Sequence, residues 1–268
     1  MSSRLNKLRV LLQTQFAYMT TYRAEIVLWM LLGVLPLLMM AVWITQANQA
    51  PGGNLRGYTA GDFASYFLAV WVSTQLVVVW VVWELNSHIR QGTLSPKLLR
   101  PIDPFWEFLA SHVGERMVRL PFLILIVTLG LLLTPGASFS GKPLNWMAYA
   151  LSITLAFLTR FLIAYCIGIL AFWSEQAISV EELYWAVYAV LSGVYAPLEF
   201  YPPFMRAAVE WTPFPYIISF PARVLSGRVE NSEIVHGLLT QAAWLSLFVL
   251  LRLLLWRKGL KRYGAVGA

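Results

Sequence analysis

Two runs of this sequence, residues 26–44 and 63–83, contain no charged residue and present no polar face. An α-helix needs about 20 consecutive apolar residues to cross the hydrocarbon core of a bilayer, and each run is close to that length. A helix that is apolar on every side is stable only among lipids or other helices. The two runs therefore predict membrane-spanning helices.

The rest of the chain has the same character. Apolar residues make up 59% of the sequence and charged residues 12%, whereas soluble domains have about 45–50% and 25%. Four further apolar runs can span a membrane, at residues 110–133, 144–173, 178–198 and 237–256. We expect an all-α integral membrane protein in which residues 1–268 form a single transmembrane domain with six spans.

Residues 1–22 are basic and carry apolar side chains at helical spacing. This pattern favours a helix that lies in the membrane interface. The alternative is that these residues are the frayed start of the first span.

The basic residues predict the orientation of the spans, because cytoplasmic loops are enriched in Lys and Arg. With both termini and the segment 86–109 on the cytoplasmic side, thirteen basic residues lie inside and five outside. The inside set is Arg4, Lys7, Arg9, Arg23, Arg90, Lys97, Arg100, Arg116, Arg119, Arg257, Lys258, Lys261 and Arg262, and the outside set is Arg56, Lys142, Arg206, Arg223 and Arg228. The net charge of +7 does not indicate nucleic-acid binding, because the basic residues flank the spans instead of gathering on one face.

No group of residues predicts catalysis, nucleotide binding or metal binding. Residues 136–142 match G-x-x-x-x-G-K, but Pro143 stands where a Ser or Thr would bind magnesium, and the loop falls on the outer side. We interpret His88, His112 and His236, which are far apart in the sequence, as interfacial or cytoplasmic polar positions rather than metal ligands. We expect no catalytic residue, no metal and no cofactor in this chain.

Several charged residues fall within or beside the spans. Arg160 lies inside the fourth run, where a charge costs about 2.5–3.5 kcal/mol on insertion scales. It could line a substrate path, or it could pair with a carboxylate or a carbonyl on a neighbouring helix. Arg252 is expected to reach toward the headgroups, and Arg116 and Arg119 either do the same or face other protein.

The longest polar interruption lies between the second and third spans. Gly92 is expected to end the helix that continues from the second span, Ser95 with Pro96 to start a short helix, and Pro101 to end it. Asp103 with Pro104 is expected to start the helix that leads into the third span, whose apolar part, residues 120–133, is too short alone. The short helix, with Leu94, Leu98 and Leu99 as apolar and Arg90, Lys97 and Arg100 as charged positions, suits docking on a soluble partner.

Residues 199–233 contain five prolines that are too closely spaced for one spanning helix. We expect short helices near residues 203–211 and 215–225 that dip partly into the membrane from the outer side.

Both segments resemble a known family. Arg90-Gln91-Gly92-Thr93-Leu94, with Lys97 and Leu98-Leu99-Arg100-Pro101, resembles the loop between spans 2 and 3 in permeases of the type-2 ABC exporter superfamily. Pro197, Pro203, Pro213-Phe214 and Pro221 resemble the outer segment between that family's fifth and sixth spans. The resemblance follows the whole chain in order, and its closest match is the branch of permeases of about this length that pair with a separate ATPase.

The resemblance implies a function and partners. A permease of this family forms a dimer, with a second copy or a sibling permease, and binds two ATPase subunits, which carry the ATP and Mg²⁺. The first of the two segments would contact the ATPase as a coupling helix, and the second, through Pro197, Pro203, Pro213, Phe214 and Pro221, would form an outer gate. The implied location is the bacterial cytoplasmic (inner) membrane, with both termini in the cytoplasm.

Two other classes of protein compete with this interpretation. An ion- or proton-coupled carrier would need ionisable residues in the middle of several spans, and Arg160 is the clear candidate. An integral-membrane enzyme would need a catalytic or metal-binding constellation at the membrane face, which the sequence does not suggest. The sequence therefore predicts an ATP-driven exporter permease without catalytic activity of its own, and leaves its cargo open.

Overall fold

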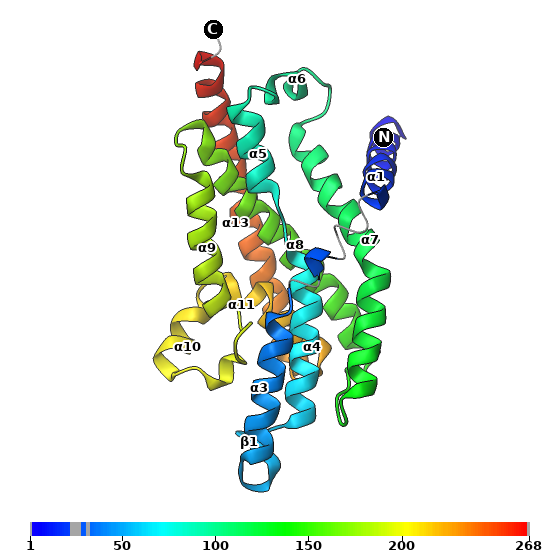
Figure 1. The fold of residues 1–268 in the computed structure, drawn as a ribbon. Coiled ribbons are helices and arrows are strands. Elements are labelled where there is room, and N and C mark those ends of the chain that lie inside the picture. The colour runs from blue at the N-terminus through cyan, green and yellow to red at the C-terminus, as the bar shows by residue number, and fades with distance from the viewer. Residues whose placement is uncertain (1, 22–27, 31–32, 267–268) are drawn as a thin grey trace.

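The computed structural model of the chain describes residues 2–21, 28–30 and 33–266, and over this part it is a bundle of α-helices with one short β-hairpin (Figure 1). The long helices are α1 (Ser2–Thr21), α3 (Leu35–Gln49), α4 (Ala60–Val77), α5 (Val81–Arg90), α7 (Pro104–Leu133), α8 (Pro143–Ile169), α9 (Ala177–Leu191) and α13 (Asn231–Val266). The short helices are α6 (Leu94–Leu98), α10 (Pro203–Glu210), α11 (Phe214–Ile217) and α12 (Ser219–Leu225), with 3₁₀ turns at Pro51–Gly53, Leu170–Phe172 and Leu198–Phe200. Strands β1 (Asn54–Leu55) and β2 (Tyr58–Thr59) pair antiparallel. The predicted all-α class is confirmed.

Five stretches of the described chain are long and apolar enough to cross a membrane: Leu28–Gln49, Ala60–Arg90, Pro104–Leu133, Pro143–Phe172 and Asn231–Tyr263. They correspond to predicted spans 1 to 4 and 6. The predicted start of span 1 at residue 26, and Arg23, lie outside the described residues. The predicted fifth span is represented by α9, which has 15 residues and so measures about 22 Å at 1.5 Å per residue, less than the roughly 30 Å of the hydrocarbon core. The six-span arrangement therefore stays a prediction.

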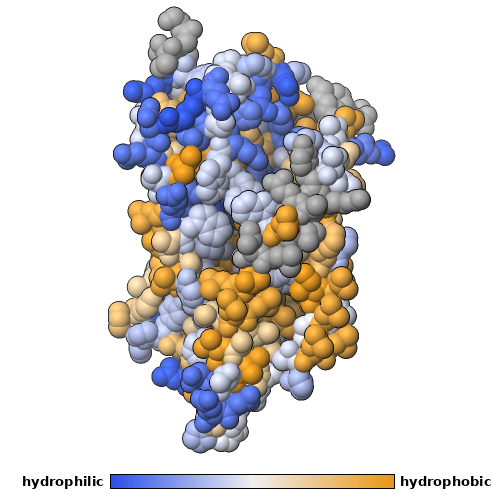
Figure 2. Space-filling model, viewed as in Figure 1, coloured by the Kyte–Doolittle hydropathy of each residue, from blue (hydrophilic) through white to orange (hydrophobic). Residues whose placement is uncertain are grey.

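The two ends of the molecule carry different elements. Helices α1 and α6 and the carboxyl-terminal end of α13 lie at one end, and β1 lies at the other (Figure 1). Figure 2 shows apolar side chains gathered in a band across the lower half of this face, with hydrophilic residues above and below it. This distribution is what a helical membrane protein requires, because lipid contacts only the band.

Helices α4 and α8 form the centre of the bundle. In the most apolar part of each, 72% of the residues are buried, against 22% for α7 and 11% for α13. Helix α12 packs on both central helices, and α13 packs along α8. The apolar residues left exposed on α7 and α13, such as Leu132, Leu133 and Leu239, are suited to face lipid.

The predicted amino-terminal helix is present as α1, which packs against α7. The two backbones approach closely at Gly114, where an added Cβ would lie 3.2 Å from the backbone of Gln15. This contact ties α1 to the end of α7 that follows α6. A location in the membrane interface stays a prediction.

Candidate functional site

Between α5 and α7, one helix ends and the next begins at the positions predicted from the sequence. Helix α5 ends at Arg90, and Gly92 follows with a φ of +70°, a conformation that side-chain-bearing residues rarely adopt. Helix α7 then begins at Pro104, with the Asp103 side chain accepting a hydrogen bond of 2.9 Å from the backbone N–H of Phe105. The expected role of Ser95 is wrong, because Ser95 lies inside α6 and its hydroxyl is 2.9 Å from the Tyr263 hydroxyl of α13.

Helix α6 has five residues, too few to be stable alone, and it is held in place by contacts on several sides. Leu94 is fully buried. Lys97 and Arg100 both form ion pairs with Glu107 of α7, the second at 3.1 Å. The Thr93 hydroxyl lies 2.7 Å from Nδ1 of His88 on α5. These contacts make α6 a fixed feature of this end of the molecule.

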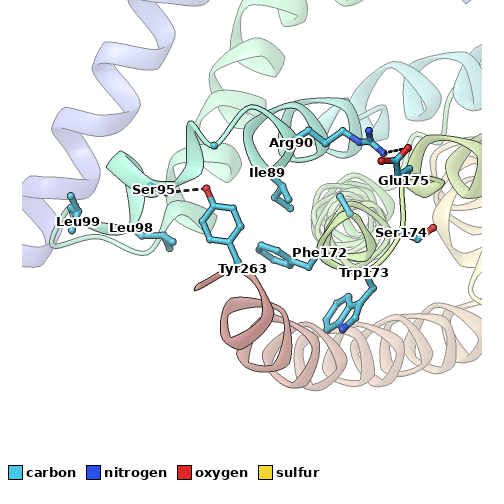
Figure 3. Close-up of a pocket in the computed structure, with 12 residues that line it drawn as sticks. Ile89, Arg90, Ser95, Leu98, Leu99, Phe172, Trp173, Ser174, Glu175 and Tyr263 are labelled. Atoms are coloured by element: carbon cyan, nitrogen blue, oxygen red, sulfur yellow. Dashed lines mark hydrogen bonds and ion pairs between the residues drawn. The ribbon is translucent and has the colours of Figure 1, made fainter. Parts of the chain in front are cut away.

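An open groove of about 850 Å³ runs beside α6 (Figure 3). Arg90 at its edge pairs with Glu175 at 3.5 Å, a contact that links α5 to the start of α9. Phe172 and Trp173 supply apolar side chains from the turn after α8. Leu99, the residue that follows α6, is 88% exposed and also lines the groove.

The nine predicted contact residues thus divide by exposure. Leu94 is buried and anchors α6, and Lys97 and Leu98 are half-buried; the exposed members are Arg90, Gln91, Gly92, Thr93, Arg100 and Pro101. Glu107, Glu175 and Tyr263 complete the arrangement and were not among the predicted site residues, whereas Leu99 was predicted as an apolar docking position. Glu175 and Tyr263 lie far from the segment in sequence, so only the fold reveals them.

Arg252 does not reach toward the headgroups as expected. It is largely buried, pairs with Asp103 at 2.7 Å, and its guanidinium lies 4.5 Å from the ring centre of Phe105. The expectation failed because the fold brings Asp103, 149 residues away in sequence, within hydrogen-bond distance of the guanidinium. This ion pair fastens α13 to the start of α7, next to the α6 segment.

Arg160 is buried in the bundle and forms an ion pair with Glu181 of α9. Its guanidinium also lies 4.4 Å from the ring centre of Tyr184 and 5.1 Å from that of Trp185. Of the two alternatives, pairing with a carboxylate on a neighbouring helix is therefore the arrangement present. A role in a substrate path stays a prediction.

Four of the five predicted outer-gate residues lie in the 199–233 segment, and Pro197 precedes it. Helix α10 begins at Pro203, as predicted, but the expected second helix is divided into α11 and α12 at Ile218. Phe214 packs against Tyr184, with 5.6 Å between ring centres. Pro197 and Pro221 are buried and Pro203 is exposed, so the five residues do not form one surface; Pro213 and Phe214 are half-buried.

Charged and aromatic residues join this outer segment to the β-hairpin. Arg228 pairs with Asp62 at 2.6 Å, and its guanidinium lies 3.8 Å from the ring centre of Tyr58. Arg223 pairs with Glu199 at 3.1 Å. Burial, with a contribution from Glu199, raises the pKa of Tyr58 to about 12, so the phenol beneath Arg228 stays neutral at physiological pH. Ion pairs and a ring contact thus hold the hairpin and the 199–233 segment together at this end of the molecule.

Three polar residues of α7 face protein, which was one of the two alternatives for Arg116 and Arg119 but was not expected of His112. His112 was expected at an interfacial or cytoplasmic position, but it is 1% exposed and accepts a hydrogen bond of 3.0 Å from the backbone N–H of Trp80. Arg116 donates to the carbonyl oxygens of Leu76 and Val78, so it faces protein. Arg119 faces protein too, through Glu115 and Gln75.

The described residues contain no group of three or more His, Cys, Asp or Glu side chains able to hold a metal ion. What this end of the molecule offers is a firmly held helix, an exposed apolar side chain and a groove. Such a surface can bind a protein partner and transmit its movement.

A family model described as an ABC-2 family transporter protein matches residues 17–267. No curated protein matches the sequence.

Proposed function

The chain belongs to the ABC-2 transporter family, and from that premise we propose that it is the transmembrane permease subunit of an ATP-driven exporter. Membership of the family makes it a multi-pass membrane protein that works with an ABC ATPase. In the proposal, two permease subunits form the substrate pathway and two ATPase subunits bind them on the cytoplasmic side. ATP and Mg²⁺ are bound by the ATPase, and this chain has no catalytic residue.

The observation that carries the proposal is the surface formed by α6 and the groove beside it. Leu99 is 88% exposed, while the helix that precedes it is anchored by Leu94, Lys97 and Arg100. An exposed apolar side chain on a rigid support is suited to enter a pocket on a partner, and such buried anchors supply most of the energy of an interface. Because α6 is bonded to α5, α7 and α13, a force applied to it would reach three helices of the bundle.

The experiment that tests the proposal compares two serine substitutions of exposed apolar residues. Leu99→Ser removes the proposed anchor, and Phe204→Ser, at a side chain that is 78% exposed on α10, is the matched control at the opposite end. The tagged full-length chain is purified from membranes with its ATPase, and the ATPase recovered per permease is measured.

Losing a buried leucine contact costs about 1.5–3 kcal/mol, so we expect Leu99→Ser to weaken ATPase binding by roughly tenfold to a hundredfold. Phe204→Ser should recover as much ATPase as the wild type. Equal recovery with both variants would contradict the proposed contact.

An ion- or proton-coupled carrier is the second candidate, and buried ionisable residues favour it. Glu115, Arg119, Arg160 and Glu181 are all buried within the bundle. Each of these carboxylates is paired with an arginine, so the charges compensate each other without a transported ion. Transport driven by a proton gradient in liposomes that lack any ATPase would establish the carrier instead.

A further inference from the structure

The second predicted span is not one continuous helix. Helix α4 ends at Val77 and α5 begins at Val81; between them Val78 has φ −59° and ψ 137°, and Trp80 has φ −115° and ψ 5°. The sequence around this break, LVVVWVVWE, contains neither glycine nor proline, the usual causes of a sharp break. The cause must therefore lie in tertiary contacts.

Arg116 of α7 binds the carbonyl oxygens that the break sets free. Its Nε donates to the carbonyl of Leu76 at 2.5 Å and its Nη2 to that of Val78 at 2.6 Å, while Nη1 donates to the carbonyl of His112. The guanidinium lies 3.6 Å from the ring centre of Phe157 on α8. One side chain thus joins α4, α7 and α8 at the break.

His112 binds the other side of the break. Its Nε2 accepts from the backbone N–H of Trp80 at 3.0 Å, and its Nδ1 lies 2.8 Å from the carbonyl oxygen of Phe108. Both contacts are satisfied by the neutral ring that carries its proton on Nδ1. Arg116 and His112, four positions apart on α7, therefore satisfy both a freed carbonyl and a freed N–H. Non-helical backbone at membrane depth is tolerated only with such compensation.

The break lies between α6, where the ATPase is proposed to bind, and α4, the other half of the second span. Helix α5 leads directly into α6, and its last residue, Arg90, pairs with Glu175 in the turn before α9. On the other side, Val78 and Trp80 line a cavity of about 300 Å³ together with Trp185 and Tyr188 of α9. A change in the angle between α4 and α5 would therefore alter the shape of this cavity.

We propose that residues 78–80 are the joint through which movement of α6 reaches the membrane-embedded half of the second span, and that Arg116 and His112 are the positioning residues that hold this joint. The inference rests on the proposed function, since it assigns the source of the movement to an ATPase. The Arg116 bonds to the carbonyls of Leu76 and Val78 and the His112 bond to the N–H of Trp80 tie the backbone just before α5 to α7, so that α5 moves together with α7 instead of bending freely.

The test is hydrogen exchange measured by mass spectrometry on the full permease–ATPase complex, with ADP and with a non-hydrolysable ATP analogue. Arg116→Met removes all hydrogen-bond donors of the side chain, and Arg116→Lys keeps the charge but not the planar fork. His112→Phe removes the acceptor of the Trp80 N–H, and His112→Gln keeps an acceptor. Lys142→Met, at an exposed loop position, is the control for loss of a basic residue. Three regions are compared: residues 90–101, residues 76–84, and residues 60–75 of α4.

In the wild type and in Lys142→Met, all three regions should exchange differently in the two nucleotide states. In Arg116→Met, exchange of residues 76–84 should rise roughly tenfold or more in both states, the scale expected for losing hydrogen bonds to a charged group, and the nucleotide response of residues 60–75 should be lost. Arg116→Lys should retain part of that response, and His112→Gln more of it than His112→Phe.

The outcomes separate the inference from the proposed function. Protection of residues 90–101 by the ATPase, with a nucleotide response of residues 60–75 that survives Arg116→Met and His112→Phe, would overturn the joint while leaving the proposed function intact. Absence of any protection of residues 90–101 by an ATPase would overturn the proposed function itself. If Arg116→Met does not fold, Arg116→Lys and the pair of His112 variants decide the question.

Discussion

Arg160 and Glu181 place a positive and a negative charge in the interior of the bundle. Among the side chains that the structure describes, Nη1 of Arg160 and Oε2 of Glu181 have no hydrogen-bond partner. A buried pair with unmet hydrogen bonds contributes little net stability, but removing one partner leaves an uncompensated charge. Replacing one member of the pair should therefore cost more stability than the intact pair contributes.

We expect Arg160→Met to destabilise the protein by about 3–5 kcal/mol, and the double variant Arg160→Met/Glu181→Met to recover most of this loss. The measurement is a double-mutant cycle of unfolding in detergent, with Glu181→Met as the second single variant. A double variant whose loss equals the sum of the two single losses would show that the residues do not interact.

Gly193 provides a second prediction for a single residue. It has a φ of +87°, and an added Cβ would lie 2.8 Å from the Ser219 Cβ and 2.8 Å from the Tyr66 hydroxyl. Gly193→Ala should lower the free energy of unfolding by at least about 1–2 kcal/mol, whereas Gly141→Ala, where a Cβ would meet nothing within 4 Å, should change it little. The measurement is thermal unfolding of the two variants side by side, and equal melting temperatures would refute the predicted strain at Gly193.

At the scale of elements, α6 depends on Glu107, because Lys97 and Arg100 both bind this carboxylate. Glu107→Ala should loosen α6, and we expect faster hydrogen exchange and faster proteolysis within residues 91–101. Since partly exposed ion pairs contribute only about 0–1 kcal/mol, the melting temperature of the whole protein should barely change. Unchanged exchange in residues 91–101 would mean that Leu94 and the hydroxyl contacts of Thr93 and Ser95 hold the helix without Glu107.

Some features of these elements could be predicted from the sequence and others could not. Gly92, Asp103 and Pro104 act through local backbone chemistry, so the end of α5 and the start of α7 could be predicted from them. The break at residues 78–80 could not be predicted, because Arg116 and His112 impose it from another helix. Glu181 was likewise visible as a charge near the start of the fifth span, but its pairing with Arg160 is a property of the packing of α8 and α9.

At the scale of the whole molecule, the predicted topology places residue 91 and the end of α13 on one side of the membrane and α10 on the other. Single cysteines at Gln91, Arg262 and Trp211, all exposed, are introduced into a Cys166→Ala background. We expect an impermeant maleimide to label Gln91→Cys and Arg262→Cys from the cytoplasmic side alone, and Trp211→Cys from the outer side alone. Labelling of all three from one side would refute the topology.

In the proposed function, α6 and Leu99 dock on an ATPase. The most direct measurement places a photo-crosslinking amino acid at Leu99, with Phe204 as the control position, in the full-length protein in its own membrane. We expect position 99 to crosslink to a subunit that also binds an ATP analogue and position 204 not to do so. A chain that transports its cargo without any ATP-binding protein crosslinked at position 99 would contradict it.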